Sequence, residues 1–167
     1  MSNTWDADDA VTEIYAAHYA SLVRMAAMLV RSTAEAEEVV QDAFVAMHGR
    51  WRRLRGSDRA LAYLRQAVVN TARSRLRHRE VEQRHRPAPL PAAVSAEQVA
   101  LLSTEHSAVF EALKDLPQRQ REAVVLRYYV DLSEAEIAAA MGVSRGAVKS
   151  HTARGMAALR TALEAPR

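Results

Sequence analysis

The sequence contains no cysteine, which excludes disulfide bonds, thiolate zinc sites and cysteine nucleophiles. Glycine and proline are scarce, with five of each in 167 residues, and aromatic residues make up only 5% of the chain. With 49% apolar residues, this composition argues against a disordered chain and is sufficient to bury a core. No apolar run approaches the roughly 18 residues that a membrane helix needs. The acidic start of the chain also differs from the basic start of a secretory signal. We therefore expect a cytoplasmic protein without membrane insertion.

Charge is distributed unevenly along the chain, and the net charge of +3 conceals this. Residues 1–49 carry two basic and eight acidic side chains, whereas residues 50–86 carry twelve arginines and three acids. Residues 87–143 are again acidic, with four basic and eight acidic side chains, and residues 144–167 have five basic and one acidic. Two basic blocks in alternation with acidic ones indicate two surfaces that face a polyanion.

Apolar residues recur at helical spacing almost throughout the chain, and no stretch alternates long enough to predict a strand. A first helix of about 19 residues is predicted from Val11 to Val30. Ser32 and Glu35 form a capping-box pattern before a second helix. Asp58 is predicted as the N-cap of a third helix, which has an apolar face and a face rich in arginine. The second helix is expected to bury a stripe made of Val40, Phe44, Met47, Trp51 and Leu54.

Three prolines at positions 87, 89 and 91 predict a flexible linker, because proline lacks the backbone N–H and disfavours helical geometry in the residue before it. Helices are expected to resume over Thr104–Leu116 and Gln118–Val130, followed by a short helix capped by Ser133 and a last helix to about Leu163. We predict an all-α protein with two small helical domains, at residues 10–80 and 104–163, joined by a linker at 81–103.

The segment Leu132–Leu159 has the pattern of a helix-turn-helix. Such a motif needs apolar anchors on both helices and a glycine at the turn, and Gly142 stands at the expected place. The second helix would then expose polar and basic side chains that can reach base edges and phosphates in a major groove. These predicted duplex-binding residues are Ser144, Arg145, Lys149, Ser150, His151 and Arg154.

Two segments in order resemble a known family. Residues 116–151, LPQRQREAVVLRYYVDLSEAEIAAAMGVSRGAVKSH, look like region 4 of the extracytoplasmic-function sigma factors of bacterial RNA polymerase. Residues 34–44, AEAEEVVQDAF, and 54–72, LRGSDRALAYLRQAVVNTA, are similar to region 2 of the same family. The resemblance spans roughly residues 10–163. It implies a region 2 helical bundle and a region 4 helix-turn-helix that reads the minus-thirty-five element.

The resemblance also assigns two surfaces in the first half. One is a solvent face of the second helix that docks on the clamp of core RNA polymerase, made of Glu38, Gln41, Asp42 and Val45. The other holds the unpaired minus-ten strand, with arginines along the backbone and an aromatic ring and an amide at the bases. Its residues are Arg55, Ser57, Asp58, Arg59, Tyr63, Asn70, Arg73 and Arg77.

Some positions leave an alternative or depart from the family pattern. Asn70 has apolar neighbours in the sequence, so a core amide is the alternative to a contact with a base. Tyr63 stands where many relatives carry tryptophan. Thr152 and Ala153 replace bulkier residues in the recognition helix, so promoter preference cannot be copied from a relative.

The family further implies that promoter DNA and core RNA polymerase are the partners, and that an anti-sigma protein holds the free factor inactive. We expect no cofactor, no nucleotide hydrolysis and no catalysis, since the chain has no glycine-rich phosphate loop and no nucleophile–base pattern. Its six histidines show no ligand spacing. Two other functions are alternatives. A stand-alone helix-turn-helix regulator with an N-terminal sensing or dimerisation domain leaves the arginine block at 50–86 unexplained. A decoy that binds polymerase or an anti-sigma factor without reading DNA would need no basic recognition residues.

Overall fold

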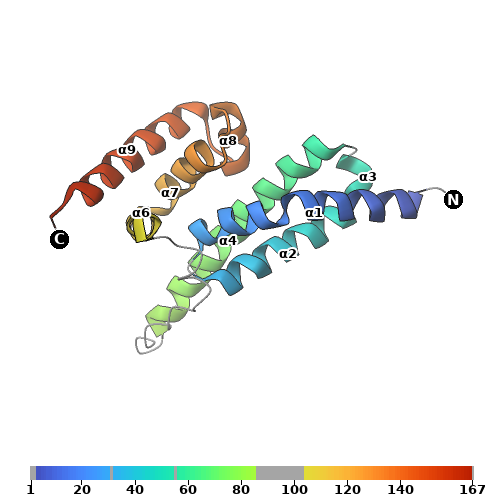
Figure 1. Cartoon of the computed structure of the whole chain (residues 1–167), viewed down its shortest axis with the longest axis horizontal. Helices are drawn as coiled ribbons and strands as arrows, with labels where there is room; N and C mark the ends of the chain where they lie inside the picture. Colours follow the sequence, from blue (N-terminus) through green and yellow to red (C-terminus); the bar gives the residue numbers. More distant parts are fainter. Residues whose placement is uncertain (1–2, 31, 55, 86–103, 167) are drawn as a thin grey trace.

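The computed structural model describes residues 3–30, 32–54, 56–85 and 104–166, and no strand occurs in these ranges. The first half of the chain, up to His85, folds into four helices (Figure 1). They are α1 (Asn3–Leu29), α2 (Thr33–Gly49), α3 (Trp51–Leu54) and α4 (Ser57–His85). The second half contains α6 (Thr104–Lys114), α7 (Gln118–Val124), the π-helical turn η1 (Val125–Tyr129), α8 (Glu134–Met141) and α9 (Arg145–Glu164).

Helices α1, α2 and α4 form a bundle around one apolar core, as the periodicity predicts. Met25, Met47, Leu64 and Val68 are almost completely buried in it. On α1, the rings of Tyr15 and Tyr19 stack with their centroids 4.5 Å apart, and the ring of Phe44 on α2 meets the Tyr15 ring edge-on at 5.0 Å. The long arginine-rich α4 packs against both α1 and α2.

Helix boundaries in this half differ from the expectation in three places. Helix α1 begins at Asn3, about eight residues before Val11. The expected continuous stripe on the second helix is broken, because α2 ends at Gly49 and Trp51 lies in the separate turn α3. Helix α4 begins at Ser57, so Asp58 lies in its first turn rather than at the N-cap. There its carboxylate still suits the positive end of the helix dipole.

Only half of the capping box predicted at Ser32 forms. The Ser32 hydroxyl accepts a hydrogen bond from the Glu35 backbone N–H at 3.2 Å. The carboxylate of Glu35 does not return to Ser32 but pairs with Arg79 of α4 at 2.7 Å. A contact between helices has therefore replaced a local one.

The helix-turn-helix in the second half is confirmed. Ser133 and Glu136 form a complete capping box at the start of α8. Helix α8 ends at Gly142, whose φ of 68° is the left-handed geometry that favours glycine. Ser144 then caps α9, its hydroxyl accepting from the Ala147 N–H at 3.1 Å. These caps fix the direction in which α9 leaves the turn.

The helix expected over Gln118–Val130 contains a π-helical turn at its end. Within η1 the Val130 N–H donates to the Val125 carbonyl oxygen at 3.1 Å, one residue further than in an α-helix. This wider turn leaves Tyr128 and Tyr129 exposed at the surface. Helical periodicity alone does not reveal such an insertion.

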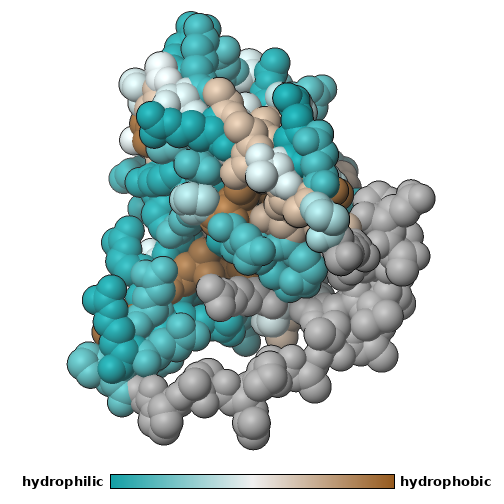
Figure 2. Space-filling model, turned by 90° about the vertical axis from the view of Figure 1, so that its left-hand side faces the viewer, coloured by the Kyte–Doolittle hydropathy of each residue, from teal (hydrophilic) through white to brown (hydrophobic). Residues whose placement is uncertain are grey.

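The two halves of the chain pack against each other. Helix α4 lies against α8, and α1 contacts α6, α7 and η1. The buried apolar residues of both halves form one contiguous cluster. In the view of Figure 2, hydrophobic residues occupy a recessed strip between hydrophilic ones. Helix α4 continues to His85, past the start of the linker predicted at 81–103, and the remaining residues of that linker, 86–103, lie outside the described residues.

A close approach of α7 and α9 depends on Gly155. A Cβ atom placed there would lie 2.7 Å from Cγ2 of Val124 and 3.2 Å from the Gln120 carbonyl oxygen. We expect Gly155→Ala to lower the free energy of unfolding by up to about 2 kcal/mol, because overpacking costs about 1–3 kcal/mol and the helix propensity gained offsets only about 1 kcal/mol of that. Chemical denaturation measures this difference.

Gly146 is the matched control in the same helix, since its nearest neighbour would be the Ser144 hydroxyl at 4.0 Å. Gly146→Ala should leave stability unchanged or raise it by at most about 1 kcal/mol. Equal effects of the two substitutions would show that the α7–α9 contact does not require glycine.

Candidate nucleic-acid interface

Helix α9 presents a basic surface at its N-terminal half. Arg145, Lys149, Ser150 and Arg154 are exposed, and His151 is half-buried. Ser144 is exposed too, although its hydroxyl is used for the cap. Lys149 lies only loosely against Glu134, with 3.9 Å between Nζ and Oε2, so its ammonium group remains available to a phosphate or a base. The six predicted duplex-binding residues therefore lie at the N-cap and in the first ten residues of one helix.

Helix α4 carries a second polar face. Arg59, Tyr63, Asn70 and Arg77 lie within about 40° of one another around the helix, given roughly 100° per residue. The side chains of Asp58, Arg59, Asn70 and Arg77 are exposed. Tyr63 is half-buried, and the Arg50 guanidinium lies 5.8 Å from the centre of its ring. Arg55 and the side chain of Ser57 lie outside the described residues.

Exposure decides between the two interpretations of Asn70. Its amide is at the surface, so the alternative of a satisfied core amide is wrong. The amide oxygen accepts a long hydrogen bond, 3.5 Å, from Nη1 of Arg73. Asn70 thus lies on the polar face of α4, where a nucleic acid can reach it.

Arg73 differs from the other predicted strand-binding residues. Its side chain is only 13% exposed, because its guanidinium pairs with Glu122 of α7 at 2.8 Å. In this arrangement Arg73 faces the second half of the chain and not the open surface of α4. A contact between Arg73 and a DNA strand remains a prediction and requires that this pairing be broken.

The predicted polymerase-binding face lies on α2 and is exposed. Val45 has 74% of its surface accessible. The carboxylates of Glu38 and Asp42 both pair with Arg75 of α4, at 2.7 and 3.2 Å. The hydrogen bond that Arg75 donates to Glu38 is the main cause that raises the pKa of Arg75 above its ordinary value. Arg75 therefore orients the two acidic side chains while their outer oxygens face solvent.

Sequence reasoning missed several residues that shape this site. Glu122 is charged but only 2% exposed. In the sequence, its segment is distinguished only by the resemblance to region 4. Arg75 was counted only as part of the arginine face. A charged residue among the apolar positions of a helix is the one signal that marked Glu122, since buried charges are almost always paired. Nothing in the sequence shows that its partner is Arg73, 49 residues earlier.

None of the helices in the described part of the chain is both long and apolar enough to cross a membrane. The described residues likewise contain no group of three or more histidine or acidic side chains able to hold a metal ion.

Comparison with known proteins identifies both halves. Residues 14–81 match the family "Sigma-70 region 2", and residues 106–159 match "Sigma-70, region 4". The chain is 37% identical over 146 residues to the RNA polymerase sigma-E factor of Streptomyces avermitilis, covering 86% of this chain and 79% of that protein. The chain belongs to the extracytoplasmic-function sigma factors of the sigma-70 family. The ECF RNA polymerase sigma factor SigM of Mycobacterium tuberculosis is 33% identical over 151 residues, covering 90% of this chain and 75% of its own.

Solved structures agree with this assignment. CnrH, solved in complex with the cytosolic domain of CnrY, matches with a TM-score of 0.71 and 26% identity over 96% of this chain and 91% of that chain. The sigma factor RpoE of Bartonella quintana, solved with the anti-sigma factor NepR, has the same fold, with a TM-score of 0.70 and 22% identity over 97% and 99% of the two chains.

The sigma factor described here therefore directs RNA polymerase to promoters, and the alternative of a stand-alone regulator is not favoured. Sigma factors are non-enzymatic transcription factors. In this sigma factor, α4 is the long helix of region 2, and α9 is the second helix of the region 4 helix-turn-helix.

Proposed function

We propose that this sigma factor uses three surfaces in promoter recognition: the α2 face for the polymerase clamp, the polar face of α4 for the unpaired minus-ten strand, and the start of α9 for the minus-thirty-five duplex. The carrying observation is that the predicted residues gather on three helices. Glu38, Gln41, Asp42 and Val45 share an exposed face of α2, and Arg59, Tyr63, Asn70 and Arg77 share one side of α4. The predicted duplex-binding residues lie at the N-cap and in the first ten residues of α9. We assign the factor two domains joined by a linker, with the bounds 10–80 and 104–163 from the sequence, and α4 extends the first of them to His85.

The α4 face is suited to a single strand for physical reasons. Arg59 and Arg77 are exposed cations at its two ends, and Tyr63 and Asn70 lie between them. Cations follow the phosphate backbone, while an aromatic ring stacks on a base of any identity. Captured bases offset the unstacking cost of a few kcal/mol, so no nucleotide hydrolysis is required and the factor has no catalysis of its own.

Regulation by a protein partner is part of the proposal. CnrH and the RpoE of Bartonella quintana were both solved with a bound protein, in the second case an anti-sigma factor. We assign to this factor a cytoplasmic location and an anti-sigma protein that holds it inactive until a signal arrives.

Transcription in vitro tests the whole proposal. Purified factor and core RNA polymerase, incubated with a library of promoter fragments, should yield defined transcripts, and the enriched sequences should share an upstream and a downstream element. Core polymerase alone is the control. Transcripts that begin without regard to sequence would contradict the proposal.

Duplex reading by α9 has its own test. Lys149→Ala and Arg154→Ala should each weaken binding of holoenzyme to the promoter by about 1–3 kcal/mol if the side chain makes a bidentate base contact, and core polymerase binding should not change. Arg160→Ala is the matched control, since Arg160 is exposed on the same helix outside the predicted set. Footprints over the upstream element that stay the same in both variants would remove α9 from the duplex.

A further inference from the structure

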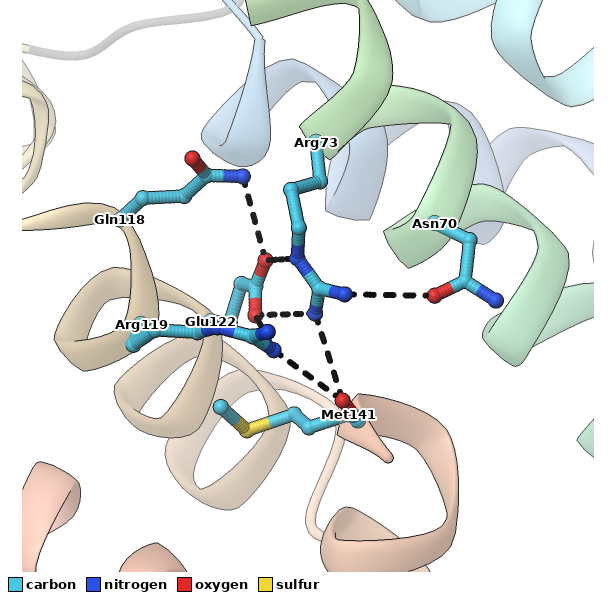
Figure 3. A network of polar contacts seen from close by, with 6 residues as sticks. All are labelled: Asn70, Arg73, Gln118, Arg119, Glu122 and Met141. Carbon is cyan, nitrogen blue, oxygen red and sulfur yellow. Dashed lines mark hydrogen bonds and ion pairs between the residues drawn. The ribbon is translucent and has the colours of Figure 1, made fainter. Parts of the chain in front are cut away.

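The two halves of the factor are joined by an ion pair with two hydrogen bonds. Arg73 Nε donates to Glu122 Oε1 at 2.9 Å, and Arg73 Nη2 donates to Glu122 Oε2 at 2.8 Å (Figure 3). The two side chains are 13% and 3% exposed. Paired bonds of this kind fix direction as well as distance, because a planar guanidinium matches a carboxylate in one plane. The pair therefore holds α4 and α7 in one defined arrangement.

Other polar groups complete a network around this pair. Gln118 Nε2 donates to Glu122 Oε1 at 3.4 Å, and Arg119 lies 3.6 Å from Oε2. The Met141 carbonyl oxygen, at the end of α8, accepts from Arg119 at 3.1 Å and from Arg73 at 3.5 Å (Figure 3). The helix that leads into the recognition turn is thus connected to the same guanidinium as α7.

Two more hydrogen bonds cross between the halves. On one side, Arg121 Nη1 donates to the Leu29 carbonyl oxygen at the end of α1, at 3.4 Å. On the other, Arg24 Nε donates to the Tyr129 hydroxyl of η1 at 2.9 Å. Arg65 of α4 is half-buried between the halves, and this burial lowers its pKa although Glu136 of α8 acts in the opposite direction. The contact between the halves is therefore polar and specific as well as apolar.

This arrangement occupies part of the predicted strand-binding face. The Arg73 guanidinium donates hydrogen bonds to Asn70, Glu122 and Met141, all within the closed arrangement. A phosphate that approached Arg73 would also meet the carboxylate of Glu122, which repels it. Binding of a strand at Arg73 and closure of the two halves thus exclude each other.

We propose that the Arg73–Glu122 pair is a latch that holds the free factor in a closed, self-inhibited conformation, and that the latch opens when Arg73 exchanges Glu122 for the DNA strand. The proposal rests on the strand-binding role assigned to α4 above. A buried ion pair suits this task, because its attraction is largely offset by the desolvation of both charges. It specifies one arrangement without making it permanent, and a phosphate can replace the carboxylate as a bidentate partner.

The conformation is measured first, without DNA. Ala20→Cys on α1 and Ala158→Cys on α9 place one spin label on each half at exposed positions, and the chain has no other cysteine. Pulsed electron–electron resonance of the doubly labelled factor should give one narrow distance distribution. Glu122→Gln should broaden it and shift it to longer distances. Glu111→Gln is the control, because Glu111 is exposed on α6 and pairs only locally with Lys114 at 3.3 Å.

Charge reversal separates the latch from a general loss of folding. Glu122→Arg should open the factor, and the double variant Arg73→Glu with Glu122→Arg should restore the narrow distribution. Circular dichroism should remain helical in each. A double variant as open as Glu122→Arg, with its helices intact, would overturn the latch.

Strand binding is then measured with a fluorescent single strand that covers the minus-ten region of a promoter recovered by in vitro transcription. Glu122→Gln should bind it more tightly by about 5- to 150-fold, the usual range of coupling between two sites, because opening no longer competes with binding. Glu111→Gln should bind like the wild type.

Unchanged distances and unchanged affinity in Glu122→Gln would refute the latch while transcription by the wild type still supports the sigma function. A factor that opens without any gain in strand affinity would refute the self-inhibition and point to a wrong strand-binding face.

Discussion

Asp42→Arg is expected to abolish the binding of core RNA polymerase. Asp42 lies midway along the exposed α2 face, between Glu38 and Val45, and pairs with Arg75 at 3.2 Å. The substitution replaces an oriented carboxylate with a cation that also repels Arg75, so both the contact and its orientation are lost. A central interface residue contributes about 2 kcal/mol or more, which is about 30-fold in affinity, and a reversed charge adds repulsion to that loss. Co-purification and titration with labelled core polymerase measure the effect.

The control for this experiment is Asp9→Arg. Asp9 is also exposed and the change in charge is identical, but the residue lies on α1, outside the predicted face. It should therefore retain polymerase binding. Both variants should keep the circular dichroism of the wild type, because neither side chain packs in the core. Normal holoenzyme formation by Asp42→Arg would mean that the clamp-docking face lies elsewhere on the bundle.

Asn70→Ala and Tyr63→Ala are expected to impair promoter melting while the closed complex still forms. In the proposed arrangement the duplex is bound through α9, far from these side chains in the sequence, and the unpaired strand lies on α4. Stacking of a base on an aromatic ring is worth roughly 1–3 kcal/mol, so its loss should lower the open fraction by about one order of magnitude. Permanganate reactivity of unpaired thymines measures the open complex, and gel retardation measures the closed one.

Two further variants make this result specific. Tyr63→Trp keeps an aromatic platform and should melt the promoter like the wild type. Gln83→Ala removes an exposed amide from the last turns of α4, outside the predicted face, and should also have no effect. A promoter that is already unpaired by mismatches near the start site should restore much of the transcription lost by Asn70→Ala. Failure of this rescue, with normal polymerase binding, would place the defect in a step other than strand capture.

The proposed Arg73–Glu122 latch bears on both polymerase binding and strand binding. If the factor arrives at polymerase closed, the α4 face becomes complete only when region 4 moves away from α4. Polymerase binding through α2 does not require that movement, since the α2 face is exposed in the closed form. Asp42→Arg and Glu122→Gln should therefore act independently, the first on polymerase affinity and the second on strand affinity.

Local patterns in the sequence were sufficient for the elements of this protein. Helical periodicity, the Ser133 capping box and the glycine at position 142 predicted an all-α chain with a helix-turn-helix, because each depends on residues within a few positions of one another. The solvent exposure of Glu38, Gln41, Asp42 and Val45 followed in the same way from their spacing opposite the buried stripe of α2. The family resemblance added the roles of these surfaces.

Only the tertiary structure decided which long side chains pair across helices. The Glu35 carboxylate pairs with Arg79 and not with its local capping partner, and Arg75 pairs with Glu38 of α2. Arg73 pairs with the carboxylate of Glu122, 49 residues later, and is largely shielded from solvent. An arginine can reach several partners at similar cost, so its choice depends on how helices from distant parts of the chain pack, and sequence spacing does not contain that information. The same holds for Gly155, whose importance comes from the approach of α7 to α9 and not from any turn in its own helix.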